Sequence, residues 1–211
     1  MSSATLPNGD SSPMIDDADP GSPWMGQSVT LATSGKSDFL WFFDFGFTLD
    51  AGDLVQGVEV EITRRQDNGM GGNIRDSKIL LTLPNGMDPI QQSPDNKADT
   101  GLNWPTSNTA KAYGGASDVW GYSGINFSEV NHADFGILIK VQETGAGMSS
   151  DAIVDSATIT VHYSPAADLF ADLIAAMLSS IGSSTTAAQQ GSGQVSFRSQ
   201  SKTVRVTPYR H

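Results

Sequence analysis

The sequence predicts an all-β protein, an antiparallel β-sandwich of jelly-roll type. Residues 39–49 hold five of the nine Phe and one of the four Trp. A second apolar run follows at residues 54–62, where Val58, Val60 and Ile62 alternate with Glu59 and Glu61. A period of two residues places alternate side chains on opposite faces of a strand. The second run is therefore a half-buried strand, and aromatic and β-branched content of this kind argues against helix.

The first run is apolar in both phases. Phe39, Trp41, Phe43, Phe45 and Phe47 share one face, while Leu40 and Phe42 occupy the other. We expect one strand that is covered on both sides.

The other strands complete a predicted domain over residues 27–163. Short alternating segments bounded by Gly, Pro, Asn and Asp are typical of strands joined by turns. We expect them at residues 27–33, 77–83, 134–142 and 151–163. Between them, residues 64–75 are a polar, Gly-rich loop and residues 87–122 a long irregular connection, with a shorter one at 127–131. A loop this long is usually functional or covers an open sheet edge.

Residues 1–26 are expected to form an extended N-terminal arm. They are rich in Ser, Pro, Gly and Asp and cannot bury enough apolar surface to fold alone. Two interpretations remain open: a disordered terminus, or an arm ordered by a partner subunit with Trp24 and Met25 as its anchors. With no Lys, no Arg and no apolar run, we expect the segment to be neither a signal peptide nor a membrane anchor.

The C-terminal part of the chain begins with a predicted helix over residues 164–182. Ser164-Pro165 favours a helix start and Gly182 a helix end. The apolar positions, Leu169, Phe170, Leu173, Ile174 and Met177, cover more than half of the helix surface. Such a helix needs cover on several sides. Three surfaces could cover the helix: its own sandwich, a bundle with other copies or a neighbouring protein, or a membrane. The membrane is least favoured because the helix has no basic face.

Beyond the helix, residues 183–193 are a Ser-, Thr-, Ala- and Gln-rich linker, and residues 194–211 a basic tail with a possible β-hairpin. The tail carries Arg198, Lys202, Arg205 and Arg210. Residues 1–172 hold 8 basic and 23 acidic residues, a net charge of −15, and the rest has +4. We expect the acidic body to repel nucleic acid and the tail to dock on an acidic surface.

The residues give little support to catalysis. Three His are present, at His132, His162 and His211, without the spacing of a metal site. Glu59 and Glu61 could form a glycosidase pair, although a solvated strand face explains them better. The chain has no Cys. We expect no enzyme activity and no cofactor.

A calcium site is a weaker option in the long connection. Asp118 could join Asp95 or Asp99, since Ca²⁺ takes several oxygen ligands. The spacing of an EF-hand loop is missing, and local turn hydrogen bonds explain these side chains better.

Several segments together resemble structural modules of tailed-bacteriophage virions. The segments are Phe43-Asp44-Phe45-Gly46-Phe47, Gly57 to Arg64, Asp76 to Ile79, Tyr113 to Gly121 and Asp134 to Ile137. The resemblance spans residues 27–163 and implies a jelly-roll-like sandwich without catalysis. It does not cover the helix or the tail.

From this resemblance and the charge split we expect a virion structural protein, most simply a capsid-decorating subunit. It would assemble in the host cytoplasm as a homo-oligomer, with a trimer as one option, and contact virion proteins such as the major capsid protein. No membrane partner is expected. The alternative is a carbohydrate-binding or host-adhesion module. In that case the loop aromatics, Trp104, Tyr113, Trp120 and Tyr122, would form an exposed sugar platform.

Overall fold

The computed structural model describes residues 2–7, 10–14, 19, 21–67, 71–85, 90–145, 149–166, 173–174 and 176–178. The chain divides into two compact units, Met1–Phe170 and Ala171–His211. The first unit holds every named strand. In chain order they are β1 Ser2–Pro7, β2 Asp10–Met14, β3 Ser28–Ala32, β4 Phe39–Phe43, β5 Leu54–Asp67, β6 Ile74–Leu83, β7 Gln91–Gln92, β8 Thr109–Gly114, β9 Gly136–Glu143 and β10 Ser149–Ser164.

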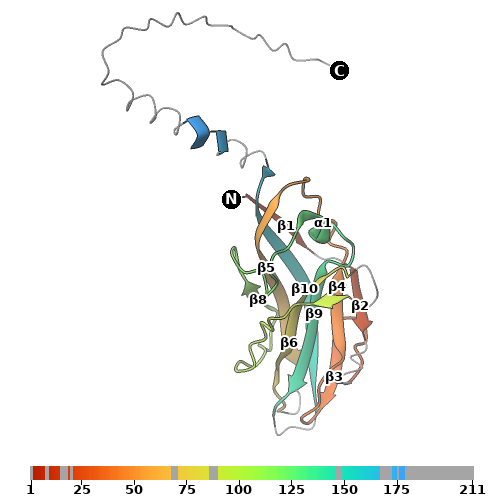
Figure 1. Ribbon diagram of the computed structural model, residues 1–211. Helices are drawn as coiled ribbons and strands as arrows, with labels where there is room; N and C mark the ends of the chain where they lie inside the picture. Colours follow the sequence, from red (N-terminus) through yellow and green to blue (C-terminus); the bar gives the residue numbers. More distant parts are fainter. Residues whose placement is uncertain are drawn as a thin grey trace, which may run out of the picture. The chain divides into compact units, whose positions relative to one another are not determined.

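The strands form two five-stranded sheets that face one another (Figure 1). The first sheet has the order β1-β10-β5-β8, with β3 also paired to β10. The second has the order β2-β4-β9-β6-β7. All these pairings are antiparallel. The predicted all-β sandwich is therefore confirmed.

The core lies between the sheets and is filled by alternate residues of the long strands. Val60 of β5 lies opposite Ile159 of β10, and neither side chain is exposed. Glu59 and Glu61, one step out of phase, lie opposite Thr160 and Thr158 on the outer face. The period-two pattern in the sequence thus identified the buried face of β5 correctly.

The aromatic run forms a shorter strand than predicted. β4 ends at Phe43, because Asp44 has a φ of 54° and the chain leaves the sheet there. Leu40 and Phe42 point into the main core, while Phe39 lies in a second apolar cluster with Leu80 and Leu138. Both faces of β4 are apolar, as expected. The prediction that Phe45 and Phe47 continue the strand is wrong, although both are buried beyond it.

The N-terminal segment is part of the sandwich, so the prediction of a separate arm over residues 1–26 is wrong. β1 pairs with β10 in the first sheet, with Ser2 opposite Tyr163. β2 pairs with β4 in the second sheet, with Met14 opposite Phe39. The physical reason is that β10 and β4 offer backbone N–H and C=O groups, and a strand can pair with them whether its side chains are polar or apolar. A polar segment can therefore be ordered without burying a large apolar surface.

Trp24 is buried in the core, with 3% of its surface exposed. Its indole Nε1 donates to the carbonyl oxygen of Asp38 at 2.8 Å. Trp24 is therefore a core residue of its own sandwich. The prediction that it anchors the arm to a partner is wrong.

Two regions predicted as loops contain strands. Residues 64–67 are the end of β5, which continues to Asp67, and residues 74–75 are the start of β6, which begins at Ile74. The connection at 87–122 includes β7 and the six-residue β8, which pairs with β5. The expected connection at 127–131 contains a short helix, α1 Phe127–Val130, with Asn126 and Glu129 forming a capping box.

Of the residues predicted to form a helix at 164–182, Ser164 still belongs to β10, and Ala166 is the first described residue that is helical. The backbone N–H of Ala166 donates to the buried carboxylate of Asp53 at 3.1 Å. In the second unit Leu173, Ile174 and residues 176–178 are helical. Among the helices of the described residues, none is both long and apolar enough to cross a membrane. The proposed linker at 183–193 lies outside the described residues.

Candidate functional site: the groove beside β8

The four aromatics predicted to form a sugar platform lie inside the sandwich. The exposed fractions are 1% for Trp104, 5% for Tyr113, 0% for Trp120 and 8% for Tyr122. A sugar platform needs an exposed ring face, so this prediction is wrong. All four rings belong to the main core cluster.

Each of these rings has a polar group with a partner inside the protein. Trp120 Nε1 donates to the carbonyl oxygen of Val58 at 2.8 Å, and Tyr122 Oη donates to that of Leu81 at 3.1 Å. Burial, with the negative charge of Glu129 as a smaller cause, raises the pKa of Tyr122 well above its usual range. Buried Trp and Tyr side chains stay stable in a core only when such partners exist.

The other two aromatics surround a buried carboxylate, Asp76 of β6. Asp76 accepts hydrogen bonds from Trp104 Nε1 at 2.7 Å and from Tyr113 Oη at 2.9 Å. It also forms an ion pair with the buried guanidinium of Arg64, which lies 4.8 Å from the centre of the Trp104 ring. Burial first, and then the negative charge of Asp76, raises the pKa of Tyr113 far above its usual range. The phenol is therefore a fixed donor.

Asp76 connects this cluster to the surface. Its second oxygen accepts the backbone N–H of Asp99 at 3.0 Å. One carboxylate thus holds both the loop that carries Asp99 and the strand that carries Tyr113. The two segments form the walls of a groove.

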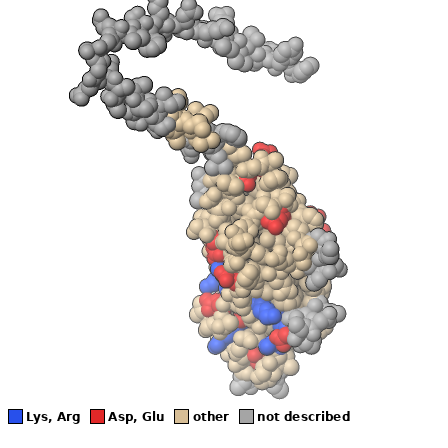
Figure 2. Space-filling model, viewed as in Figure 1, with Lys and Arg blue, Asp and Glu red and all other residues tan. Residues whose placement is uncertain are grey.

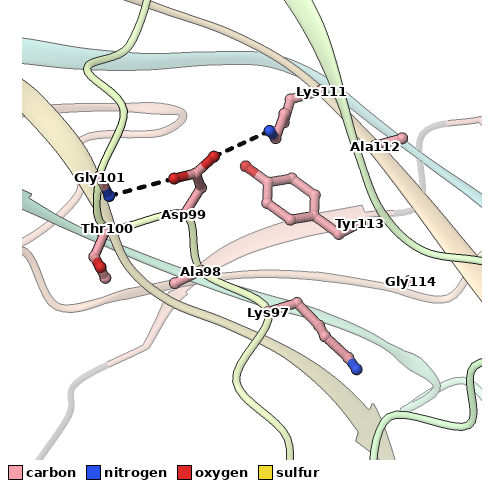
Figure 3. Close-up of a pocket in the computed structure, with 9 residues that line it drawn as sticks. All are labelled: Lys97, Ala98, Asp99, Thr100, Gly101, Lys111, Ala112, Tyr113 and Gly114. Carbon is pink, nitrogen blue, oxygen red and sulfur yellow. Dashed lines mark hydrogen bonds and ion pairs between the residues drawn. The ribbon is translucent and has the colours of Figure 1, made fainter.

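The groove has a volume of about 430 Å³ and lies along β8, the last strand of its sheet (Figure 3). One wall is residues 97–101 and the other is residues 111–114. The carboxylate of Asp99 lies between them, accepting from Lys111 Nζ at 3.1 Å and from the backbone N–H of Gly101 at 3.3 Å. The ring of Tyr113 lies beside this pair (Figure 3).

The charges at the groove are paired. The bond to Lys111 is the main cause that lowers the pKa of Asp99. Lys97 Nζ lies 2.8 Å from a carboxylate oxygen of Asp118 and 3.2 Å from one of Asp95. Burial lowers the pKa of Lys97, but its bonds to Asp118 and Asp95 outweigh this effect, so that its pKa lies above the usual value. Side chains of both signs are interspersed on the face shown in Figure 2.

These ion pairs correct the calcium hypothesis. The ammonium of Lys97 lies between Asp95 and Asp118, where the hypothesis placed a metal ion. Asp99 is occupied by Lys111 instead. Over the described ranges no group of three or more His, Cys, Asp or Glu side chains could hold a metal ion.

The candidate catalytic residues are dispersed. His132 is exposed and its Nδ1 accepts the backbone N–H of Asp134 at 3.1 Å. His162 is half-buried on β10, and its Cα lies opposite that of Gly57. His211 lies outside the described residues.

The C-terminal residues predicted to bind partners fall into two groups. Leu173, Ile174 and Met177 are helical, and each is more than half exposed. The remaining predicted contacts lie outside the described residues: Leu169, Phe170, Arg198, Lys202, Arg205 and Arg210.

Sequence reasoning missed β8 and its groove. The clue was available, because Lys111 and Tyr113 alternate with Ala110 and Ala112 over six residues. Two alanines on one face gave this segment too little apolar character to stand out within a loop.

Comparisons with known proteins leave the family open. No family model matches the chain, and neither does any curated protein. Among solved structures, a xylan-binding module of CBM15 is 15% identical, with a TM-score of 0.29, and covers 74% of this chain and 89% of that one. A mutant of Xylanase10C from Cellvibrio japonicus, in complex with xylopentaose, is 16% identical with a TM-score of 0.31, over 76% of this chain and 27% of that one. The fold assignment rests on the strand pairing described above.

Proposed function

We propose that the chain is a non-enzymatic assembly subunit, a β-sandwich that joins other copies of itself through its C-terminal helix. One observation carries this proposal. Four apolar side chains of the helix are exposed: Leu173 by 51%, Ile174 by 56%, Met177 by 55% and Leu178 by 64%. Leaving such groups in water forgoes about 1.5–3 kcal/mol for each side chain that could be fully buried.

The spacing of these side chains suits a helix–helix contact. Leu173 and Met177 are four residues apart, as are Ile174 and Leu178. Residues four apart lie on the same helix face, so the two pairs make adjacent rows of one apolar stripe. No charged residue lies between residues 173 and 197. Copies can therefore approach along the stripe without electrostatic repulsion.

Light scattering on the full chain tests the proposal. We expect the full chain to have a multiple of its monomer mass at tens of micromolar, and the double variant Leu173→Asp/Met177→Asp to be monomeric. Leu102→Asp is the matched control, because Leu102 is 57% exposed on the sandwich, and it should leave the mass unchanged. A monomeric full chain would refute the proposal.

We further propose that the chain is a capsid-decorating subunit of a bacteriophage particle. It is supported by the sequence resemblance over residues 27–163 and by the basic charge of residues 173–211 against an acidic body. A chain lacking residues 183–211 should fail to bind particles that the full chain decorates. Equal occupancy by both chains would overturn this setting.

A second candidate is a carbohydrate-binding module that uses the groove beside β8. The specific observation is a concave site of about 430 Å³ with polar side chains on its walls. Since Lys97, Asp99 and Lys111 are each in ion pairs, the groove favours an uncharged, hydroxyl-rich ligand over an ion.

Glycan binding can be separated from assembly. The substitution Thr100→Trp should fill the groove and abolish binding on a glycan array, whereas Leu102→Asp nearby should keep it. The absence of any bound glycan for the unchanged chain, or binding that survives Thr100→Trp, would remove this candidate.

A further inference from the structure

β8 ends its sheet with a row of accessible peptide groups. β5 is its sole partner among the strands of the described residues. Five of its six residues are exposed or half-exposed, and Tyr113 alone is buried. An edge strand of this kind can accept a further strand through main-chain hydrogen bonds.

The pairing phase identifies which peptide groups are available. The N–H of Gly115 donates to the carbonyl oxygen of Val58, so this pair marks the hydrogen-bonded phase of the ladder. In an antiparallel pair that phase returns at every second residue, which places Tyr113 and Lys111 in it. Ala110 and Ala112 lie in the other phase, and their N–H and C=O groups point away from β5.

The edge of β8 lacks the usual protection. Of the other strands that end the two sheets, β1 contains Pro7, β2 contains Pro13 and β7 has only two residues, whereas β3, with five residues and no proline, is also unprotected. Proline and short length both discourage pairing at an edge. β8 has six residues and no proline, and the side chains beside its outward peptide groups are small.

We propose that the edge of β8 binds residues 203–206 of a second copy as an added antiparallel strand. This segment, Thr203-Val204-Arg205-Val206, lies outside the described residues and has the period-two pattern of a strand. The inference rests on the proposed function, because it requires that copies meet through their C-terminal segments.

The chemistry of the two faces of β8 fits this occupant. Lys111 and Tyr113 lie on the groove side, where the methyl groups of Val204 and Val206 would contact the Tyr113 ring and the Lys111 stem. On the outer face, Ala112 lies opposite Glu61, and Gly114 opposite Glu59. The guanidinium of Arg205 would extend over the Ala112 methyl group toward these two carboxylates. The net charges of −15 and +4 add a longer-range attraction between body and tail.

Hydrogen exchange in mixed samples of the full-length chain tests the proposal. An isotope-labelled acceptor carries Arg205→Pro, which removes the N–H that would face Ala112, so its own tail cannot pair, and an unlabelled donor carries Ala112→Pro, so its own edge is blocked. We expect the Ala112 amide of the acceptor to exchange at least tenfold more slowly after the donor is added. A donor that carries both prolines is the control and should have no effect.

A charge exchange tests the register. Arg205→Glu in the donor should reduce the protection, and Glu61→Arg in the acceptor should restore it. Unchanged exchange of the Ala112 amide would overturn the proposal, as would protection that persists with the control donor, which would indicate a contact that uses neither residues 203–206 nor the edge of β8 in the donor. If either result is found while light scattering still shows an oligomer, only the proposal of strand addition at β8 is rejected. If light scattering shows a monomer, the proposed function itself is refuted.

Discussion

Replacing Asp76 with Ala should destabilise the sandwich more than any change of a surface charge. Asp76 has no exposed surface and accepts from four donors: Arg64, Trp104, Tyr113 and the backbone N–H of Asp99. Removing one partner of a buried ion pair costs about 3–5 kcal/mol, and each further donor left without an acceptor adds about 1–3 kcal/mol unless water reaches it. Leaving all three further donors dry would bring the loss to about 6–14 kcal/mol; because water can reach most of them in the space that the carboxylate leaves, we expect the free energy of unfolding to fall by about 4–6 kcal/mol.

Urea unfolding measures this loss. With a slope of about 2 kcal/mol per molar urea, the midpoint should fall by about 2–3 M. Asp99→Ala is the matched control, because it removes an ion pair at the surface whose carboxylate is 30% exposed, and it should cost about 1 kcal/mol or less.

Two results would refute this reasoning. One is a loss for Asp76→Ala no larger than that for Asp99→Ala. The other concerns the double variant Arg64→Met/Asp76→Asn. We expect it to cost less than the sum of the two single changes, because neither charge is then left unpaired in the core, and a cost equal to that sum would refute the reasoning.

Three further predictions concern single residues. Gly114→Ala should cost at least about 1–3 kcal/mol in unfolding free energy, because φ is +74° and the new Cβ would lie 2.4 Å from a carbonyl oxygen of β5, whereas Gly115→Ala, with nothing within 4 Å, should be nearly neutral. Trp24→Ala should lower the unfolding free energy by about 3–5 kcal/mol in urea titrations and leave the oligomer mass unchanged; a change of mass without a change of stability would restore the partner-anchor interpretation. Burial alone would raise the pKa of Asp118, but the bond to Lys97 outweighs burial and lowers the pKa below the usual 3.8. The ionised Asp118 therefore contributes stability above pH 3.8, and this contribution is lost as the pH falls through the lower pKa of the folded state. Unfolding curves against pH should therefore flatten in this acid range for Asp118→Asn, and an unchanged acid limb would contradict the assignment.

Strands that bury one face could be predicted from the sequence, whereas strands defined by a distant partner could not. Val58, Val60 and Ile62 reveal β5 because burial itself sets their spacing. The sequences of β1 and β2 have no alternation of apolar and polar residues of that length. Their pairing with β10 and β4 depends on backbone groups, which every residue except proline supplies alike.

The aromatic residues of the long connection show a second limit. Trp and Tyr combine an apolar body with a polar group, and this suits both an exposed binding surface and a core that offers a partner. The choice depends on whether acceptors such as Asp76 or the carbonyl of Val58 lie within reach. Those acceptors come from β6 and β5, far away in the sequence, so no local pattern could report them.

The position of β10 governs the order in which this protein can be completed. β10 lies between β1 and β5 in the first sheet and also pairs with β3, yet it follows all three in the chain. During synthesis, β1 and β3 emerge from the ribosome long before the strand that will hold them. Contacts between segments so far apart in sequence form slowly. Until β10 arrives, the newly made chain exposes unpaired strands, and this interval is when its risk of aggregation is greatest.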